Sequence, residues 1–322
     1  MTRIAIYLML IMSVMSCSNE FDVIDDFKEI PVVYGLLDSD SPYQYIRIER
    51  AFSDEKISAL ELASNPDTLY YKNLTVTITN KKSGEVFTLE EVDGNTIGIP
   101  RDTNGIFATT PNLLYRIETS KLNPNFTDNF VLDAYRGDEH LLSSSTKFVK
   151  QPYIKTPSSA EADINIVYKN FTVEYAFKDN AFIADAYFDV NVIDFFADQS
   201  TEFKTIRIYV TKATDKTVLR YDGVNFYTSI AAALKNQEVE FRQLVSVDLT
   251  VLTGGQSISD YIRVGQANSG ITSSGETPVF SNIENGVGVF SSISKLTNSY
   301  GLKQAALDSL RNGIYTKDLK FK

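Results

Sequence analysis

The segment "YIRIERAF" (residues 45–52) alternates apolar and polar side chains with a period of two residues. In an extended chain, Ile46 and Ile48 face one way, whereas Arg47 and Glu49 face the other. Five further segments repeat the pattern: "NLTVTITN" (73–80), "NFTVEYAF" (170–177), "AYFDVNVI" (186–193), "TIRIYVTK" (205–212) and "SVDLTVLT" (246–253). Strands of this kind bury one face and wet the other, which is typical of antiparallel sandwiches. The alternation therefore predicts a mainly β fold.

Turn signals separate these strands and support the same interpretation. They are Lys82-Ser83-Gly84, Asp93-Gly94-Asn95, Thr103-Asn104-Gly105, Asp222-Gly223 and Gly254-Gly255. Their spacing favours sandwich layers over βαβ units. Short helices are expected at residues 55–64, 229–237 and 301–313, the last with Gly313 as its C-terminal stop.

The segment "KQPYIKTPSSAEAD" (150–163) interrupts the alternation with two prolines and two serines, so it is the expected domain boundary. We predict two β-sandwich domains, immunoglobulin- or transthyretin-like, at residues 30–150 and 151–322, with a few short helices. The glycine-rich "NIENGVGVF" (282–290) suits a bulge or a place where one backbone closely approaches another. Alternatively, it is a loop and strand that fix the C-terminal sandwich.

Residues 1–16 have the layout of a secretory signal peptide: one arginine, about nine apolar residues and a small residue before the cut site. The apolar run is shorter than the roughly 20 residues that a membrane-spanning helix needs. The end of this segment, Val14-Met15-Ser16-Cys17, resembles the lipobox of bacterial lipoproteins. The resemblance implies cleavage between Ser16 and Cys17 and attachment of lipid to Cys17. Several acyl chains, such as palmitate, make a stable anchor where a single chain holds only marginally.

Cys17 is the only cysteine, so no disulfide is expected in the exported protein. Residues 17–29 are acidic and lack periodicity, which predicts a tether, and early acidic residues resemble the surface-export signal of Bacteroidota lipoproteins. The whole chain carries 31 Lys+Arg and 41 Asp+Glu, a net charge of −10. An acidic surface repels phosphate backbones, so no nucleic-acid partner is expected.

The search for catalytic or metal-binding residues finds no complete set. His140 is the only histidine and no GxSxG motif accompanies it, so neither a Ser-His-Asp set nor a zinc site is expected. Asp38 and Asp40 lie two residues apart, but the glycine and late glutamate of a calcium-binding EF-hand loop are missing. A solvated turn that closes a hairpin is the simpler interpretation of "LDSDSP" (37–42).

Three weaker patterns remain. "SSTK" (144–147) and "SISK" (292–295) match the Ser-x-x-Lys spacing of penicillin-binding enzymes, but no SDN or KTG motif follows. The aromatic pairs Tyr70-Tyr71 and Phe195-Phe196 suit core packing better than a ligand surface. The 41 acidic residues leave open a hydrolase that uses two carboxylates, although no pair is singled out.

Four longer segments carry a family resemblance: "PVVYGLLDSDSPYQYIRIERAF" (31–52), "ASNPDTLYYKNLTVTI" (63–78), "FYTSIAAAL" (226–234) and residues 252–292, which end in "PVFSNIENGVGVFSS". In this order they resemble a family of Bacteroidota outer-membrane lipoproteins, the domain-of-unknown-function group 4249 or a close relative. The resemblance implies a lipid-anchored protein of the outer membrane, at the cell surface or the periplasmic face. It also implies a partner such as a TonB-dependent transporter or another envelope protein.

The sequence therefore predicts a lipid-anchored binding or accessory protein that is not an enzyme and carries no cofactor. The alternative is a cell-surface hydrolase that acts on glycans or peptides through a carboxylate pair.

Overall fold

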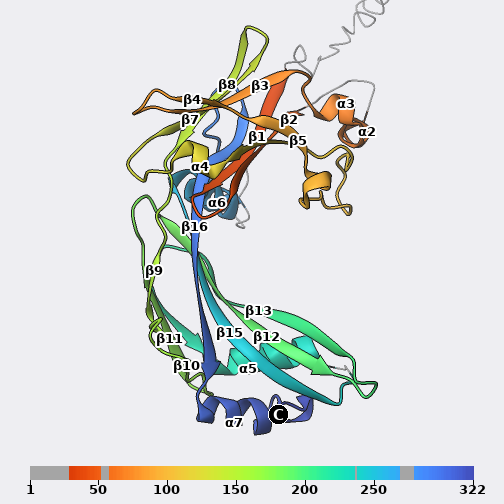
Figure 1. Ribbon diagram of the computed structural model, residues 1–322, viewed down its shortest axis with the longest axis vertical. Helices are drawn as coiled ribbons and strands as arrows, with labels where there is room; N and C mark the ends of the chain where they lie inside the picture. Colours follow the sequence, from red (N-terminus) through yellow and green to blue (C-terminus); the bar gives the residue numbers. More distant parts are fainter. Residues whose placement is uncertain (1–28, 52–57, 236–237, 269–278) are drawn as a thin grey trace, which may run out of the picture.

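The computed structural model describes residues 29–51, 58–235, 238–268 and 279–322. The fold is mainly β, with 48% strand and 19% helix, in agreement with the predicted β-sandwich class. Two sandwiches stack along the long axis of the molecule (Figure 1). The predicted signal peptide (1–16) and nearly all of the predicted tether (17–29) lie outside the described residues. No helix in the described ranges is long and apolar enough to cross a membrane.

One large sheet, of nine strands within the described residues, belongs to both sandwiches. Its main path runs in the order β13 (Thr201–Thr214), β12 (Ile183–Phe195), β15 (Phe241–Gly254), β16 (Val287–Leu302), β1 (Ile30–Asp38), β2 (Tyr43–Ala51), β6 (Leu113–Glu118) and β5 (Glu90–Asp93). The short strand β10 (Asp163–Ile164) also pairs with β16. The sheet therefore runs without a break from one sandwich into the other.

The long strand β16 makes this continuity possible. Its first half pairs in parallel with β1, from Val287 opposite Val32 to Ile293 opposite Asp38. Its second half pairs antiparallel with β15, from Ile293 opposite Gly254 to Tyr300 opposite Val247. Figure 1 shows the strand passing from the upper to the lower sandwich.

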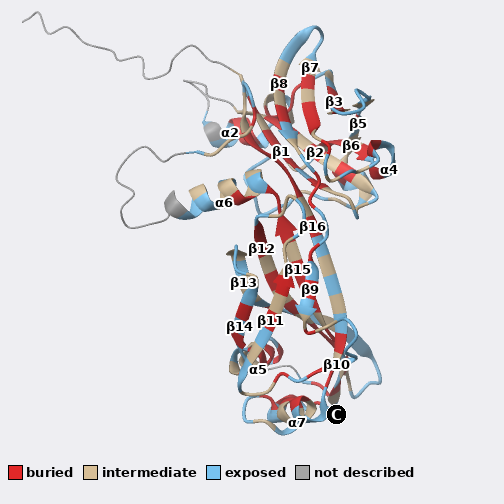
Figure 2. Cartoon of the chain, turned by 90° about the vertical axis from the view of Figure 1, so that its left-hand side faces the viewer, coloured by how far each residue is buried: buried red, intermediate tan, exposed pale blue. Residues whose placement is uncertain are grey.

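A smaller sheet completes each sandwich. The upper one has the order β4 (Val86–Thr88), β3 (Leu74–Asn80), β7 (Phe130–Arg136) and β8 (Glu139–Thr146). The lower one has the order β14 (Val218–Asp222), β11 (Asn170–Ala176) and β9 (Tyr153–Thr156). Figure 2 shows buried segments of β12 and β15 in the lower sandwich and of β1 and β7 in the upper sandwich.

Two hydrophobic clusters fill the sandwiches. The upper cluster is built from residues 33–148 together with Ile283 and Phe290, and the lower one from residues 154–321. The proposed boundary at 150–163 falls between them along the chain, but it also contains strand β9, whose Ile154 is buried. Ile283 and Phe290 return to the upper cluster because β16 pairs with β1.

Short helices and 3-10 turns connect the strands or follow the last of them. They are α2 (Ala59–Ser64), α3 (Pro66–Leu69), η2 (Gly94–Ile97), α4 (Thr119–Leu122), α5 (Gly223–Leu234), α6 (Gln256–Asn268), α7 (Gln304–Asn312) and η3 (Lys317–Leu319). Helix α5 begins earlier than predicted, because the side chain of Asp222 caps it by accepting a hydrogen bond from the backbone N–H of Val224. Helix α7 ends at Gly313 as predicted. Helix α6 was not predicted.

All six alternating segments form strands, and their apolar faces contribute the cores. The side chains of Ile46, Val76, Val173, Val190 and Leu249, one from each of five of these strands, are completely buried. In the sixth strand, β13, Ile206 and Ile208 are buried as well. The period of two thus identifies the buried face of each strand correctly.

The close backbone approach predicted for residues 282–290 is present. Gly288 has φ +120°, and a Cβ atom there would lie 2.0 Å from the carbonyl oxygen of Val33 on β1. Only glycine fits this conformation beside another backbone. The alternative interpretation assigned this segment to the C-terminal sandwich alone. Strand β16 also belongs to the upper sandwich, because it pairs with β1.

Candidate ligand-binding cavity

A cavity of about 500 Å³ opens on the outer face of strands β1 and β2. The residues that line it are Val32, Tyr34, Arg47, Glu49, Arg50, Ala51, Leu69, Arg101 and Phe107. Its size is in the usual range for small-molecule sites. Three arginines and two aromatic residues therefore gather in one hollow of a protein whose net charge is −10.

The floor of the cavity consists of residues on two paired strands. Tyr34 of β1 is opposite Arg47 of β2, and Val32 is opposite Glu49. The other face of both strands is buried in the upper core, where Val33 and Ile46 are completely inaccessible. Alternation along the strands thus places these four side chains on a rigid base.

The wall of the cavity is made by Leu69 of α3 and by Arg101 and Phe107 of the loop that follows η2. Asn65 caps α3 by accepting a hydrogen bond from the backbone N–H of Asp67, and Pro66 occupies the first turn. The backbone N–H of Ala108 donates to the carbonyl oxygen of Ala63, which holds the loop against α2. Leu69, Tyr70 and Ala108 form a small third hydrophobic cluster behind this wall.

Glu49 carries the negative charge of the cavity and lies between two guanidinium groups. Its Oε1 atom accepts hydrogen bonds from Arg101 at 2.6 Å and from Arg47 at 3.1 Å. Arg101 also donates to the hydroxyl of Tyr70 at 3.1 Å and lies over the ring of Phe107 at 4.7 Å. Burial alone would lower the pKa of Arg101, but the hydrogen bond and charge of Glu49 outweigh it and raise the pKa.

These contacts leave part of both guanidinium groups unused. Arg47 and Arg101 donate only through Nη1, so their Nε and Nη2 groups have no partner among the described residues. Both side chains are largely buried, with 21% and 13% exposure. Among the described lining residues, Arg47 and Arg101 share the carboxylate of Glu49, and Arg50 is paired with Glu29, so one positive charge and several unpaired donors remain. Half-buried donors without partners favour an anionic ligand.

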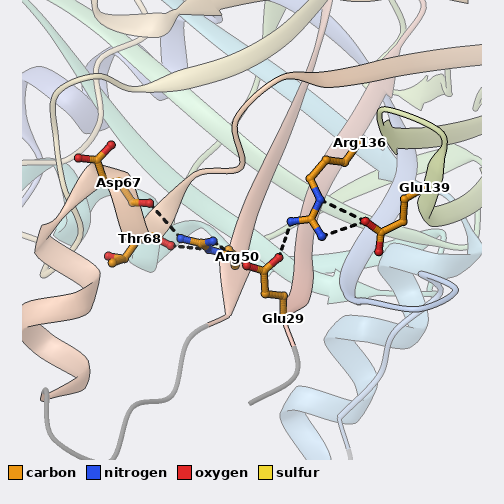
Figure 3. Close-up of polar contacts among 6 residues, drawn as sticks. All are labelled: Glu29, Arg50, Asp67, Thr68, Arg136 and Glu139. Carbon is orange, nitrogen blue, oxygen red and sulfur yellow. Dashed lines mark hydrogen bonds and ion pairs between the residues drawn. The ribbon is translucent and has the colours of Figure 1, made fainter. Parts of the chain in front are cut away.

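Arg50, at the edge of the cavity, has a different role because all its nitrogen atoms are used (Figure 3). It donates to the carbonyl oxygens of Thr68 and Asp67 and to the carboxylate of Glu29, at 2.8, 2.9 and 2.8 Å. These bonds attach the end of α3 to β2. They also attach Glu29, which immediately precedes β1.

Glu29 also accepts a hydrogen bond from Arg136 at 2.8 Å, and Arg136 in turn donates to Glu139 (Figure 3). Burial alone would raise the pKa of Glu29, but the hydrogen bonds and charges of Arg136 and Arg50 together lower it. Tyr71 lies under both guanidinium groups, 5.7 and 5.9 Å away, and burial raises its pKa to about 12. We call Glu29, Arg50, Arg136 and Tyr71 the N-terminal clamp, because they fix the point where the chain enters β1.

The structure places the residues considered in the sequence as follows. Ser16 and Cys17 lie outside the described residues. Asp38 and Asp40 lie in the β1–β2 hairpin turn, as expected, and no group of three or more metal-ligating side chains occurs in the described ranges. His140 is on β8, partly exposed, with its Nε2 atom 3.0 Å from Asp133.

The Ser-x-x-Lys serines are packing residues. Ser144 donates to the carbonyl oxygen of Asn282, and Ser292 to that of Lys147, and both serines are buried. Tyr70 and Tyr71 are buried as expected, and Phe195 stacks on Phe241 at 4.3 Å. None of these residues lines the cavity.

Sequence reasoning missed the cavity, although it placed Arg47 and Glu49 correctly on the polar face of β2. It read that face as solvated, whereas Glu49 is only 5% exposed. The missing component is Arg101, 52 residues further along the chain. Its position in a turn-rich segment gives no periodic signal that would connect it to β2.

Comparison of the sequence with protein-family models and with curated proteins gives no match to either.

Proposed function

We propose that this chain is a lipid-anchored outer-membrane protein that binds a ligand in the cavity over β1 and β2 without transforming it. The observation that carries the binding role is the pair of partly unpaired guanidinium groups of Arg47 and Arg101 in a hollow of about 500 Å³. The lipobox-like Val14-Met15-Ser16-Cys17 supports the anchor. The family resemblance supports an outer-membrane transporter or another envelope protein as partner.

The chemistry of the cavity fits binding better than hydrolysis. Among the described residues that line it, Glu49 is the only carboxylate, and it is ion-paired with two arginines. A hydrolase of the two-carboxylate type needs an acid and a base, or an acid and a nucleophile, on either side of the bond. The charged groups that contact Glu49 are two arginines, and the described lining offers no second carboxylate to act across a bound ligand.

The binding role can be tested on the full-length protein extracted in mild detergent. It is incubated with a small-molecule extract of the growth medium, washed and denatured, and the released compounds are identified by mass spectrometry. We expect a compound recovered unchanged and in stoichiometric amount from the wild type, and depleted from Arg101→Lys. Recovery of cleavage products in excess over the protein would contradict the proposal and favour the hydrolase.

Arg116→Lys provides a matched control for that experiment. Arg116 also bonds one carboxylate, Glu90, at 2.8 Å and lies over an aromatic ring, Tyr43, at 4.9 Å, but it is outside the cavity. We expect it to retain the compound as the wild type does.

The anchor is tested by membrane fractionation of Cys17→Ala beside Ser18→Ala, which keeps the thiol. We expect the first variant to leave the membrane fraction and the second to remain there. Equal recovery of both variants in the membrane would refute lipid attachment at Cys17.

A further inference from the structure

Resting on the proposed binding role, we infer that the cavity selects a singly charged carboxylate attached to an apolar or aromatic body. The charges of the described lining residues balance when one negative charge is added. Arg47 and Arg101 contribute two positive charges and Glu49 one negative charge, so one monoanion neutralises the set. A dianionic phosphate would leave an excess negative charge among half-buried groups, which is costly.

The free donors of both arginines have the geometry that binds a carboxylate. In each guanidinium the Nε and Nη2 groups are free among the described residues, and they are adjacent on one edge of the planar fork. This edge matches the two oxygens of a carboxylate, which an arginine binds through two parallel hydrogen bonds. Because Arg101 is fixed by Glu49, Tyr70 and Phe107, little further ordering is needed for it to bind.

The uncharged residues that line the cavity are apolar or aromatic. Val32, Ala51 and Leu69 contribute aliphatic surface, and Tyr34 and Phe107 contribute aromatic rings that are 44% and 40% exposed. Burial, together with the nearby hydroxyl of Tyr261 on α6, raises the pKa of Tyr34, so this ring stays neutral at physiological pH. Large aromatic side chains left partly open beside charged donors favour a ligand with one apolar and one anionic end.

Two sources share this chemistry: a free aromatic acid and the C-terminus of a short peptide that ends in an apolar residue. Isothermal titration of the full-length protein in detergent would distinguish them with four probes. They are 3-phenylpropionate, its amide, the N-acetylated peptide Gly-Gly-Phe and its C-terminal amide, and phenyl phosphate is titrated beside them as a dianionic comparison. We expect at least one acid to bind and its amide to bind about ten-fold more weakly or worse, the usual scale for a charged hydrogen-bonded pair. The tighter acid identifies the source.

Variants assign the binding to the cavity. We expect Arg101→Lys to weaken the acid about ten-fold or more, because lysine lacks the planar fork, and Arg116→Lys to leave it unchanged. Equal affinity for acid and amide, tighter binding of phenyl phosphate, or no binding of either acid would each overturn the inference. The binding role itself is tested separately, by the recovery of a compound from the growth medium. That recovery does not depend on the outcome of these titrations.

Discussion

The substitution Gly288→Ala tests the contact that joins the two sandwiches. The new methyl group would lie 2.0 Å from the carbonyl oxygen of Val33, and 2.9 Å from its amide nitrogen and carbonyl carbon. Relief to an ordinary contact of 3.4 Å needs a shift of about 1.4 Å between β16 and β1. Val33 and Gly288 are register partners in the second pair of the parallel ladder, so this shift would break the ladder where β16 joins β1.

The magnitude follows from two contributions. A φ of +120° is a strained conformation for alanine and costs about 1–3 kcal/mol. Two backbone hydrogen bonds that are lost from a buried ladder cost about 1–3 kcal/mol each when their groups stay unsatisfied. Partial relaxation reduces the sum, so we expect a loss of about 3–6 kcal/mol. This is a large share of the about 5–15 kcal/mol that stabilises a typical domain.

Gly84→Ala is the matched control. Gly84 also has a positive φ, +78°, but a Cβ atom there meets nothing within 4 Å. The control therefore reports backbone strain alone, about 1–2 kcal/mol. Urea unfolding followed by the near-ultraviolet circular dichroism of the tyrosines measures both variants, and amide hydrogen exchange of residues 32–37 locates the effect on β1. A loss in Gly288→Ala no greater than in Gly84→Ala would refute the close approach of β16 to β1.

Three further predictions concern stability. Arg242→Leu removes one of the two cations that contact buried Asp194, and Lys204 stays 2.8 Å from its other oxygen. We expect a loss of about 2–4 kcal/mol in thermal or urea unfolding, because the substitution also removes the buried hydrogen bond to the carbonyl oxygen of Leu319. The exposed variant Arg207→Leu should lose about 1 kcal/mol or less, and equal losses would contradict the burial argument. Burial raises to about 12 the pKa of three tyrosines, Tyr71, Tyr175 and Tyr221. The unfolded chain releases these protons near pH 10, whereas the folded chain retains them up to about pH 12. The free energy of unfolding should therefore keep its full value below about pH 10 and fall between pH 10 and pH 12, by about 3 kcal/mol for each tyrosine. Urea midpoints read beside tyrosinate absorbance check this, and a midpoint independent of pH in that window would refute it. Gly265→Ala fills open space within α6 and should raise stability by about 0.5–1 kcal/mol, whereas a loss in thermal unfolding would show that the site is not an open helical position.

The strands could be predicted because the alternation that defines them is local. Ile46 and Val76 need only their own neighbours in sequence to be assigned to a buried face. Helix α6 was missed although Ile258, Tyr261 and Ile262 follow the helical i, i+3, i+4 spacing, because this apolar stripe is short and lies among polar residues. It is held by tertiary packing on β16, where the backbone N–H of Ile258 donates to the hydroxyl of Ser291.

The partner of the glycine-rich segment shows the same limit. The sequence indicated that a backbone comes close to residues 282–290, because glycine is concentrated there. It did not indicate which backbone, since Val33 lies some 250 residues earlier and parallel pairing leaves no local mark. The cavity was missed for the same reason: Arg47 and Arg101 meet only after β2 and the loop after η2 have been folded together.

The cavity lies beside the N-terminal clamp, so the proposed anchor at Cys17 would limit the distance between the cavity and the membrane. Arg50 lines the cavity and also holds Glu29, so the chain enters β1 beside the binding site. Eleven residues lie between Cys17 and Glu29, so these two residues can be at most about 40 Å apart. With lipid on Cys17, the point where the chain enters β1, beside the cavity, stays within that reach of the bilayer, while α7 and the C-terminus lie at the far end of the molecule (Figure 1). A ligand held at the end nearest the membrane is placed where a transporter in the same membrane could receive it, and this placement connects the cavity to the proposed partner.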